Sequence, residues 1–308
     1  MIYDSVLETI GNTPLIRLTR FSRSMGTNAV LLGKIESRNP GGSAKDRIAL
    51  AMIRDAERTG KLKPGGTIIE ATSGNTGIGL SLAASVLGYQ VVLTMPETMS
   101  VERQKILRAF GAKLVLTPGP KGMAGANEAA EKLHKQIPNS IRILQFENPV
   151  NPQAHFDATG PEIWRDCDGK LDAFVAAVGT GGTLCGAGGY LKRQDAGIRV
   201  CAVEPVESAL LSGGQAGPHG IQGIGANFIP DTYDGSLVDE VLTVSTQEAL
   251  ETAKALMLTE GLLCGISSGA AACGALKLAK RSEMAERTIV VVLNDTGERY
   301  LSTPLFDA

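Results

Sequence analysis

The feature that most constrains the fold is the alternation of short apolar runs, rich in β-branched residues, with longer segments of helical periodicity. In the first half, the runs that indicate buried strands are 67–71, 91–95, 113–117 and 141–146. In the second half they are 173–179, 198–204, 241–245 and 288–294. Helical patterns lie between them, for example at 100–111, 125–137, 246–261 and 270–281. Because near-continuous apolar strands joined by helices are typical of parallel sheets covered on both faces, the sequence predicts an α/β fold.

The length of the chain and one break in this pattern predict two domains. At 308 residues the chain exceeds the usual size of a single compact core. Two prolines interrupt the pattern in ENPVNP, at 147–152. We therefore expect a smaller, mobile N-terminal α/β domain of residues 36–146 and a larger α/β domain of residues 1–35 and 147–308. Each should contain a doubly wound parallel sheet, with the active site between them.

Composition excludes several classes of function. The chain is 43% hydrophobic and 20% charged, with a formal net charge of -2, so neither nucleic acid nor an anionic membrane is an expected partner. No apolar run approaches the roughly 18 residues that a membrane span needs. The start, MIYDSVLETIGNTP, lacks the basic and apolar regions of a secretory signal, which favours a cytoplasmic location.

The cysteines and histidines give no metal or disulfide pattern. The cysteines are odd in number, widely spaced and never in C-x-x-C, and most lie in apolar surroundings, which favours small buried hydrophobes over a disulfide framework or a zinc site. They are Cys167, Cys185, Cys201, Cys264 and Cys273. The histidines are too scattered for metal ligation, so surface or packing roles are expected for His134, His155 and His219.

A lysine follows a run of small residues in NPGGSAKDRI, at 39–48. Ser43 and Asp46 fit a capping box, which predicts a helix that begins around Lys45. A cation is disfavoured in the first turn of a helix, so Lys45 should lose its proton more readily than an ordinary lysine. That property suits an imine-forming amine, and a solvated surface lysine is the plain alternative.

Three further loops of small residues are predicted to lie where a strand leads into a helix. TSGNTG (72–77) offers hydroxyls and helix-start amides suited to a carboxylate, or it is only a capping turn. GTGGT (179–183) lets the backbone approach a phosphate, although tight turns also use glycine. LLCGISSGAA (262–271) places Ser267 and Ser268 at a third such junction. Neither the dinucleotide fingerprint nor the P-loop motif is present in these loops.

In combination, these motifs support a resemblance to a known family. The chain resembles the cysteine synthase, or O-acetylserine sulfhydrylase, family of the fold-type II pyridoxal-phosphate enzymes, and most closely its A isozyme. The likeness covers nearly the whole chain in order. It includes ETIGNTPLIRL, NPGGSAKDR, EATSGNTG, GPEIW, GTGGT, IQGIGANFIP, GISSGA and ERYLSTPLF.

The resemblance implies a role for each motif residue. Lys45 would carry pyridoxal 5'-phosphate as an imine, and Asn75 would bond the ring hydroxyl oxygen. Ser267 would face the pyridine nitrogen with a neutral hydroxyl. The phosphate would be held by Gly179, Thr180, Gly181, Gly182 and Thr183. The substrate would be bound by Thr72, Ser73, Thr76, Gln145 and Gly225.

The resemblance also implies a reaction and partners. O-acetyl-L-serine would lose acetate to give an aminoacrylate, and sulfide would add to it to give L-cysteine, so the enzyme would be a transferase. Family members are homodimers, and many bind the C-terminal tail of serine acetyltransferase. Segment 221–230 would line the cleft and help to select O-acetylserine. Asn227 is a departure, because glycine is expected at that place in close relatives.

Alternatives remain within and outside this family. A cystathionine β-synthase would share the lysine and both loops, and an O-phosphoserine-dependent enzyme should carry an arginine in 221–230, which this chain lacks. Outside the family, a nucleotide-binding dehydrogenase would share the fold class but needs a glycine fingerprint that is not seen. A catalytically idle scaffold for an acetyltransferase is a further alternative, disfavoured by intact Lys45, Asn75 and Ser267.

Overall fold

The structure is a computed structural model that describes residues 2–72 and 74–307. Its contacts divide the chain into two compact units. Unit 1 consists of Met1–Ile10 and Asn39–Val150, and unit 2 consists of Gly11–Arg38 and Asn151–Ala308. The division expected from the sequence differs from this grouping in residues 1–10, 36–38 and 147–150. That residues 36–146 form a mobile domain stays a prediction.

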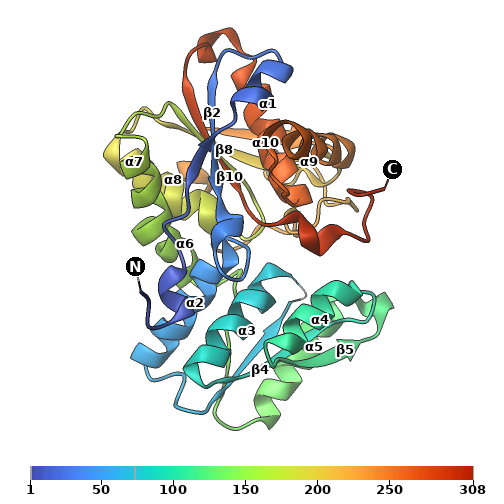
Figure 1. The fold of residues 1–308 in the computed structure, drawn as a ribbon. Coiled ribbons are helices and arrows are strands. Elements are labelled where there is room, and N and C mark those ends of the chain that lie inside the picture. The colour runs from blue at the N-terminus through green and yellow to red at the C-terminus, as the bar shows by residue number, and fades with distance from the viewer. Residues whose placement is uncertain (1, 73, 308) are drawn as a thin grey trace. The chain divides into compact units, whose positions relative to one another are not determined.

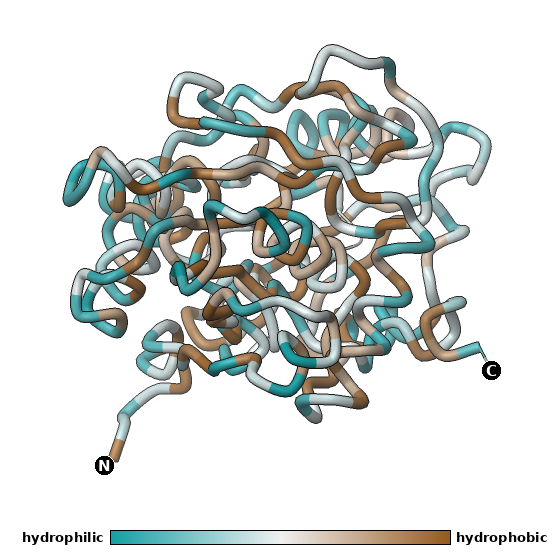
Figure 2. The backbone as a smooth tube through the Cα atoms, turned by 90° about the horizontal axis from the view of Figure 1, so that it is seen from above, coloured by the Kyte–Doolittle hydropathy of each residue, from teal (hydrophilic) through white to brown (hydrophobic). Residues whose placement is uncertain are grey.

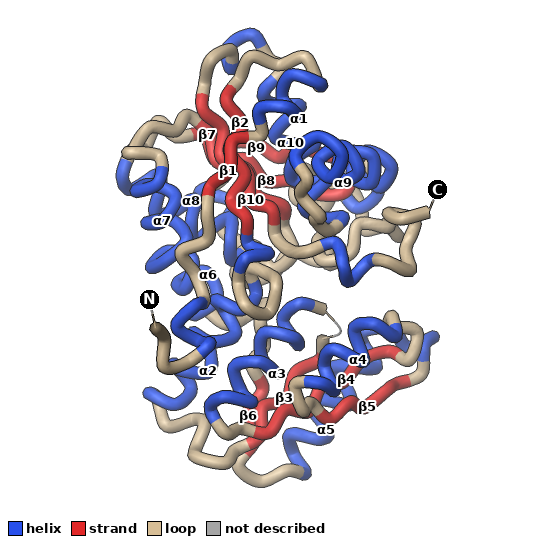
Figure 3. Tube along the Cα trace, in the orientation of Figure 1, coloured by secondary structure: helices blue, strands red, loops and turns tan. Residues whose placement is uncertain are grey.

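Unit 1 is built on a four-stranded sheet in the order β5-β4-β3-β6, with every neighbouring pair parallel (Figures 1 and 3). Its strands are β3 (Thr67–Ala71), β4 (Gln90–Pro96), β5 (Lys113–Thr117) and β6 (Ser140–Arg142). Its α-helices are α2 (Lys45–Arg58), α3 (Asn75–Leu87), α4 (Val101–Ala109) and α5 (Gly122–Gln136). Ala126 and Ala130 of α5 pack on Ile69 and Val92 of the sheet, while α2 packs against α3.

Unit 2 is built on a six-stranded sheet in the order β1-β2-β10-β7-β8-β9. Only β1 runs antiparallel among the strands that the described residues form. The strands are β1 (Leu15–Arg17), β2 (Val30–Ile35), β7 (Ala173–Ala177), β8 (Arg199–Pro205), β9 (Glu240–Val244) and β10 (Thr288–Leu293). The helices are α1 (Thr19–Ser24), α6 (Val150–Ala154), the π-helix η4 (His155–Thr159), α7 (Gly160–Asp166), α8 (Gly182–Gln194), α9 (Thr246–Glu260) and α10 (Ile266–Ala279).

Successive side chains of the central strands pack into two different cores, one on each face of this sheet. In β10, Val291 and Leu293 join a core with α9 and α10, whereas Val290 and Val292 join a second core with α7 and α8. Successive strand residues point to opposite faces, so a strand that is buried on both sides must be apolar throughout. Figure 2 shows the hydrophilic, teal stretches on many of the outlying turns. The predicted α/β class with parallel sheets is confirmed.

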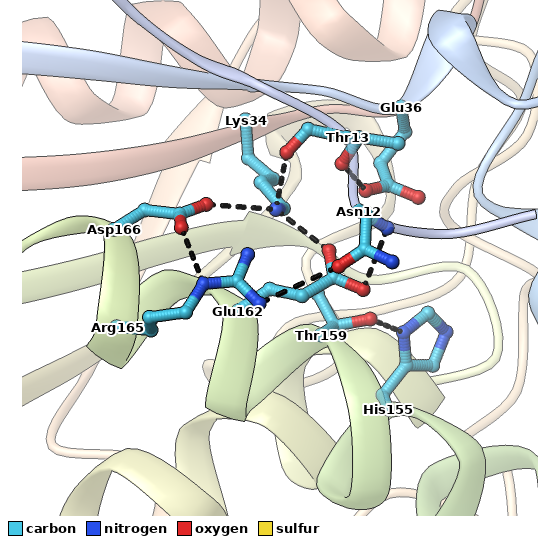
Figure 4. A network of polar contacts seen from close by, with 9 residues as sticks. All are labelled: Asn12, Thr13, Lys34, Glu36, His155, Thr159, Glu162, Arg165 and Asp166. Carbon is cyan, nitrogen blue, oxygen red and sulfur yellow. Dashed lines mark hydrogen bonds and ion pairs between the residues drawn. The ribbon is translucent and has the colours of Figure 1, made fainter. Parts of the chain in front are cut away.

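A fully buried lysine ties the N-terminal part of unit 2 to its helices (Figure 4). Lys34 Nζ lies 2.7 Å from a carboxylate oxygen of Glu162 and donates to the carbonyl of Thr13 at 2.6 Å. The second oxygen of Glu162 accepts the backbone N–H of Asn12 at 2.9 Å. Removing one partner of such a buried ion pair typically costs about 3–5 kcal/mol. The GNTP part of the N-terminal motif and the acidic residue of GPEIW therefore have a structural role in unit 2.

Most of the predicted elements occur close to their expected bounds, and 141–146 is the main exception. β6 ends at Arg142, and the chain then turns at Leu144, which has a positive φ of 54°. Segment 209–234 contains no helix or strand among the described residues. Within residues 2–72 and 74–307, no helix is both long and apolar enough to cross a membrane.

Candidate active site

Lys45 is the first residue of α2, and its side chain is half-buried. The predicted capping box is wrong in detail. Ala44 occupies the N-cap without a side-chain hydrogen bond, and Ser43 Oγ accepts the N–H of Lys45 at 3.2 Å. The buried carboxylate of Asp46 accepts the N–H of Gly41 at 2.5 Å, because the chain of small residues folds back over the helix start. The small residues thus let their own backbone pack around the start of α2.

The TSGNTG loop leads from β3 into α3, as predicted. Gly74 is the N-cap and donates its N–H to Thr72 Oγ1 at 3.2 Å, and Asn75 and Thr76 begin the helix. Thr72 and Thr76 are buried. The first amides of a helix have no partner within the helix, so this start offers N–H donors for an anion. Ser73, predicted to bind substrate, lies outside the described residues.

Gln145 is hydrogen-bonded to the start of α3, and the resemblance assigns both partners of this bond to the substrate. Thr76 Oγ1 donates to Gln145 Oε1 at 2.5 Å. The buried carboxylate of Glu70, on β3, accepts the backbone N–H groups of Leu144 at 3.0 Å and Gln145 at 3.2 Å. These bonds take the place of strand pairing at the left-handed Leu144, which explains why β6 ends early. Burial raises the pKa of Glu70, against the lowering effect of these two hydrogen bonds.

The GTGGT loop connects β7 to α8, as predicted. Gly181 is the N-cap of α8 with a positive φ of 84°, a conformation that favours glycine. Thr180 Oγ1 accepts from Asn151 Nδ2 at 2.9 Å and from the N–H of Gly182 at 3.3 Å. Thr232 Oγ1 donates to the carbonyl of Thr180 at 2.5 Å. Side chains from two other segments therefore hold this loop in place, where it leads into a 13-residue helix.

Ser267 lies in the first turn of α10 and is buried. The predicted strand before this helix is wrong: α9 precedes it, and Cys264 forms only a single bridge to Thr296. The N-cap is Gly265, and neither serine caps the helix, whereas Ser268 Oγ accepts the N–H of Asp295 at 3.5 Å. The apolar residues at 262–264 belong to a short connection between two helices, which explains why they did not mark a strand.

The glycines of segment 221–230 lie beside the GTGGT loop in unit 2. Gly225 donates its N–H to the carbonyl of Val178 at 3.1 Å, and its carbonyl contacts His219 Nε2 at 2.8 Å. A Cβ on Gly223 would lie 3.9 Å from Ser267 Oγ. Asn227 has a positive φ of 63° and accepts from Ser208 Oγ at 2.7 Å. The expectation of glycine at position 227 thus has a physical cause in the backbone.

The cysteines are free, and all but the half-buried Cys167 are buried, as predicted. Burial raises the pKa of the Cys201 and Cys264 thiols to about 12 and that of Cys167 to about 11. These thiols are unsuited to nucleophilic catalysis at neutral pH, because the thiolate is the reactive form. No group of three or more His, Cys, Asp or Glu in the described part of the chain is arranged to hold a metal ion.

Sequence reasoning missed the residues that support the predicted loops. Glu70 accepts the backbone N–H of Gln145. Asn151 and His155 contact the two threonines of the GTGGT loop. Asn151 and His155 are four residues apart, which is one helical turn, and both are fully buried. A polar pair at that spacing in a helix preceding the GTGGT motif was the available signal.

Comparison with known proteins decides the family. The model of a family described as pyridoxal-phosphate dependent enzymes matches residues 6–295. This chain belongs to that family. It is 50% identical over 314 aligned residues to cysteine synthase A of Escherichia coli (strain K12), covering 99% of this chain and 96% of the relative.

Solved structures agree with this relationship. A crystal structure of cysteine synthase from Entamoeba histolytica has a TM-score of 0.96 and 49% identity, covering 99% of this chain and 91% of that one. A crystal structure of O-ureido-L-serine synthase has a TM-score of 0.95 and 44% identity, covering all of this chain and 96% of the other. The recognised resemblance is confirmed.

The residues on each unit fit pyridoxal phosphate, the cofactor of the family. Unit 2 supplies a glycine-lined helix start with Thr180 and Thr183, a donor set suited to a phosphate. Ser267 supplies a neutral hydroxyl, and unit 1 supplies the Lys45 amine at a helix start. The GTGGT loop contains no acidic side chain, so it would not repel a dianion.

Proposed function

We propose that this protein is a cysteine synthase, which replaces the acetoxy group of O-acetyl-L-serine with sulfide to give L-cysteine and acetate. The observation that carries the proposal is 50% identity to a cysteine synthase over 99% of the chain. The geometry of the loops supports it, because each helix start offers donors of the kind that one part of the cofactor or substrate requires.

Residues of both units would serve one cofactor. Lys45 and Asn75 are assigned from unit 1, and Gly179, Thr180, Gly181, Gly182, Thr183 and Ser267 are assigned from unit 2. Pyridoxal phosphate supplies a carbonyl that condenses with amines and a ring that delocalises negative charge from Cα. The part played by the protein is to bind, to orient and to move protons.

Lys45 would act as the base. Its Nζ takes the Cα proton of the substrate as the Cβ–O bond breaks and acetate departs, and it returns a proton to Cα after the Cβ–S bond has formed. A position at the start of α2 disfavours the ammonium form through the helix dipole, so the neutral amine is more accessible there.

Ser267 would set the electronics of the ring. A neutral hydroxyl does not hold the pyridine nitrogen protonated as a carboxylate would, so charge on Cα is less delocalised. Prompt loss of a group from Cβ is then favoured over transamination. The buried position of Ser267 keeps water from competing for this contact.

The start of α3 would bind the substrate carboxylate. The bond from Thr76 to Gln145 Oε1 orients the amide of Gln145, so that its NH₂ group is the part that donates to an anion. Thr72 and the helix-start amides would add further donors, and the resemblance also assigns Ser73 and Gly225 to the substrate. Charged acceptors make the strongest hydrogen bonds of this kind.

The finer assignments are also part of the proposal. We assign the enzyme to the transferases and expect a homodimer in the cytoplasm. The C-terminal tail of a serine acetyltransferase is a candidate partner for the active site. The boundaries of a mobile domain at 36–146 belong to the same set of expectations.

A spectral titration tests the function. Purified protein should be yellow, its absorbance should change on addition of O-acetylserine, and sulfide should restore the original spectrum with release of cysteine. Homocysteine in place of sulfide tests the cystathionine β-synthase alternative, and O-phosphoserine tests the donor. The likeness to an O-ureido-L-serine synthase makes hydroxyurea a further nucleophile to compare. Absence of cysteine among the products would refute the proposal.

A further inference from the structure

His155 is a fully buried histidine that directly contacts the GTGGT loop in unit 2. Its Nε2 lies 3.1 Å from Thr183 Oγ1, and its Nδ1 lies 2.8 Å from Thr159 Oγ1, the contact drawn in Figure 4. Thr159 is also fully buried. The imidazole therefore stands between two hydroxyls, one of which belongs to the loop assigned to the phosphate.

Close packing of two helices places His155 there. A Cβ on Gly186 of α8 would lie 2.1 Å from the carbonyl of Pro152 and 2.8 Å from Cβ of His155, so only glycine permits this approach. The segment that carries His155 is the π-helix η4, a conformation frequent at functional sites. One turn earlier, Asn151 donates to Thr180. Two buried side chains thus reach the two threonines of the loop.

A neutral imidazole has one donor and one acceptor nitrogen, so the chain of hydroxyls has two possible proton arrangements. In the first, Thr159 donates to Nδ1 and the Nε2–H group donates to Thr183, whose own proton is then available to an anion. In the second, the Thr183 hydroxyl donates its hydrogen bond to Nε2, so that only its oxygen lone pairs face the anion. A phosphate favours the first arrangement, because it accepts hydrogen bonds and does not donate them when it is fully ionised.

We infer that His155 is a positioning residue for the cofactor phosphate: its Nε2–H tautomer fixes Thr183 as a hydrogen-bond donor to the phosphate. The inference rests on the proposed function, since it takes the GTGGT loop as the phosphate site. It predicts a contribution of His155 to the binding of pyridoxal phosphate that is absent for pyridoxal, which has no phosphate.

Two substitutions separate the two nitrogens. The amide of glutamine reaches the position of Nε2, so His155→Gln keeps a donor to Thr183. The amide of asparagine reaches only the position of Nδ1, so His155→Asn keeps the contact to Thr159 and loses the one to Thr183. Thr183→Val removes the loop hydroxyl itself and serves as the reference. Thermal unfolding of the cofactor-free variants measures any general loss of stability.

The expected result is a difference between the two cofactor forms. His155→Asn should raise the Kd for pyridoxal phosphate about three- to tenfold, the range for one lost hydrogen bond, and Thr183→Val should raise it about tenfold. His155→Gln should stay within about twofold of the native protein, and the Kd for pyridoxal should change less than about twofold in all variants. In the native protein loaded with pyridoxal phosphate, ¹⁵N shifts of the His155 ring should show a protonated Nε2 and an unprotonated Nδ1.

Two results would overturn the inference and differ in what they imply. If Thr183→Val weakens binding of pyridoxal phosphate while His155→Asn and His155→Gln behave alike, the phosphate loop stands and the role of His155 fails. If Thr183→Val prefers pyridoxal phosphate over pyridoxal as strongly as the native protein does, the loop assignment fails and the inference with it. The ring shifts need no variant that must fold, and a protonated Nδ1 with an unprotonated Nε2 would refute the tautomer directly.

Discussion

Two helix starts, α3 in unit 1 and α8 in unit 2, both follow a strand through a loop of small residues, yet they are ordered by different means. At α3 the order comes from side chains, as in the bond from Thr76 to Gln145. At α8 the backbone supplies more of it, with Gly181 at positive φ and Gly182 packed too closely on Asn151 to leave room for a Cβ. The first arrangement suits a small planar carboxylate, and the second suits a phosphate that the backbone must approach closely.

This difference teaches which kind of change each site should tolerate. A site made of side chains should fail when one polar atom is removed, with the cofactor still bound. A site made of backbone should fail when one carbon atom is added, because there is no room for it. Activity should be more sensitive to substitution of Lys45, the proposed base, than to a change in either helix start.

Lys45→Ala is expected to have the largest effect. Turnover of O-acetylserine should fall by at least about a thousandfold, because the amine that condenses with the cofactor and the base that moves the Cα proton are one group. Steady-state cysteine formation measures the loss, with the exposed Lys61→Ala as the control. Unchanged circular dichroism should accompany it, and appreciable synthase activity would contradict the assignment.

Gly182→Ala should break the backbone-built site. Its Cβ would lie 1.9 Å from Oδ1 of the fully buried Asn151, whose Nδ2 is held in place by its hydrogen bond to Thr180. Overpacking of this kind costs about 1–3 kcal/mol, so affinity for pyridoxal phosphate should fall by about ten- to a hundredfold. Gly189→Ala is the matched control on the same helix, where a Cβ meets its nearest atom at 3.4 Å. Equal cofactor affinity of the two variants would argue against a tight backbone cradle.

Thr76→Val should break the site built from side chains while leaving the other intact. Loss of the bond that orients Gln145 should lower kcat/KM for O-acetylserine about tenfold, the value of one polar contact to a charged group. The Kd for pyridoxal phosphate should stay unchanged. Ser85→Ala, near the other end of α3, is the control, because its hydroxyl donates within the helix, to the carbonyl of Leu82 at 2.8 Å. A parallel loss of cofactor affinity would show that the two sites are not separable.

Asn227→Gly should have the smallest effect and sharpen the role of segment 221–230. Glycine suits the left-handed backbone at this position but loses the bond from Ser208, so the free energy of unfolding should change by less than about 1 kcal/mol. Asn227→Ala loses the bond and strains the backbone as well, so it should cost about 1–2 kcal/mol more. Urea unfolding distinguishes them, and equal stability of the two variants would remove the backbone from the explanation.

The fold was predictable where periodicity and burial coincide. Strands such as β7 and β10 are apolar throughout because both faces are covered, and this pattern marked them clearly. The strand predicted over 141–146 was wrong beyond Arg142, because a buried carboxylate from β3 captures the amides that a strand would have paired. That carboxylate lies more than seventy residues away in the sequence, so no local pattern could reveal it.

The candidate site was predictable in its loops but not in their supports. TSGNTG and GTGGT stand at helix starts, as their small residues and the preceding strands indicated. The contacts that hold them come from distant segments, such as His155 to Thr183 across 28 positions. Such contacts depend on how distant helices pack against each other, and no local pattern in one sequence shows that packing.

The most direct test of the central claim is to find the lysine that carries the cofactor. Purified protein loaded with pyridoxal phosphate is reduced with borohydride, digested and analysed by mass spectrometry. The account predicts one modified peptide, with the pyridoxyl group on Lys45. A cofactor found on another lysine, or on none, would contradict it.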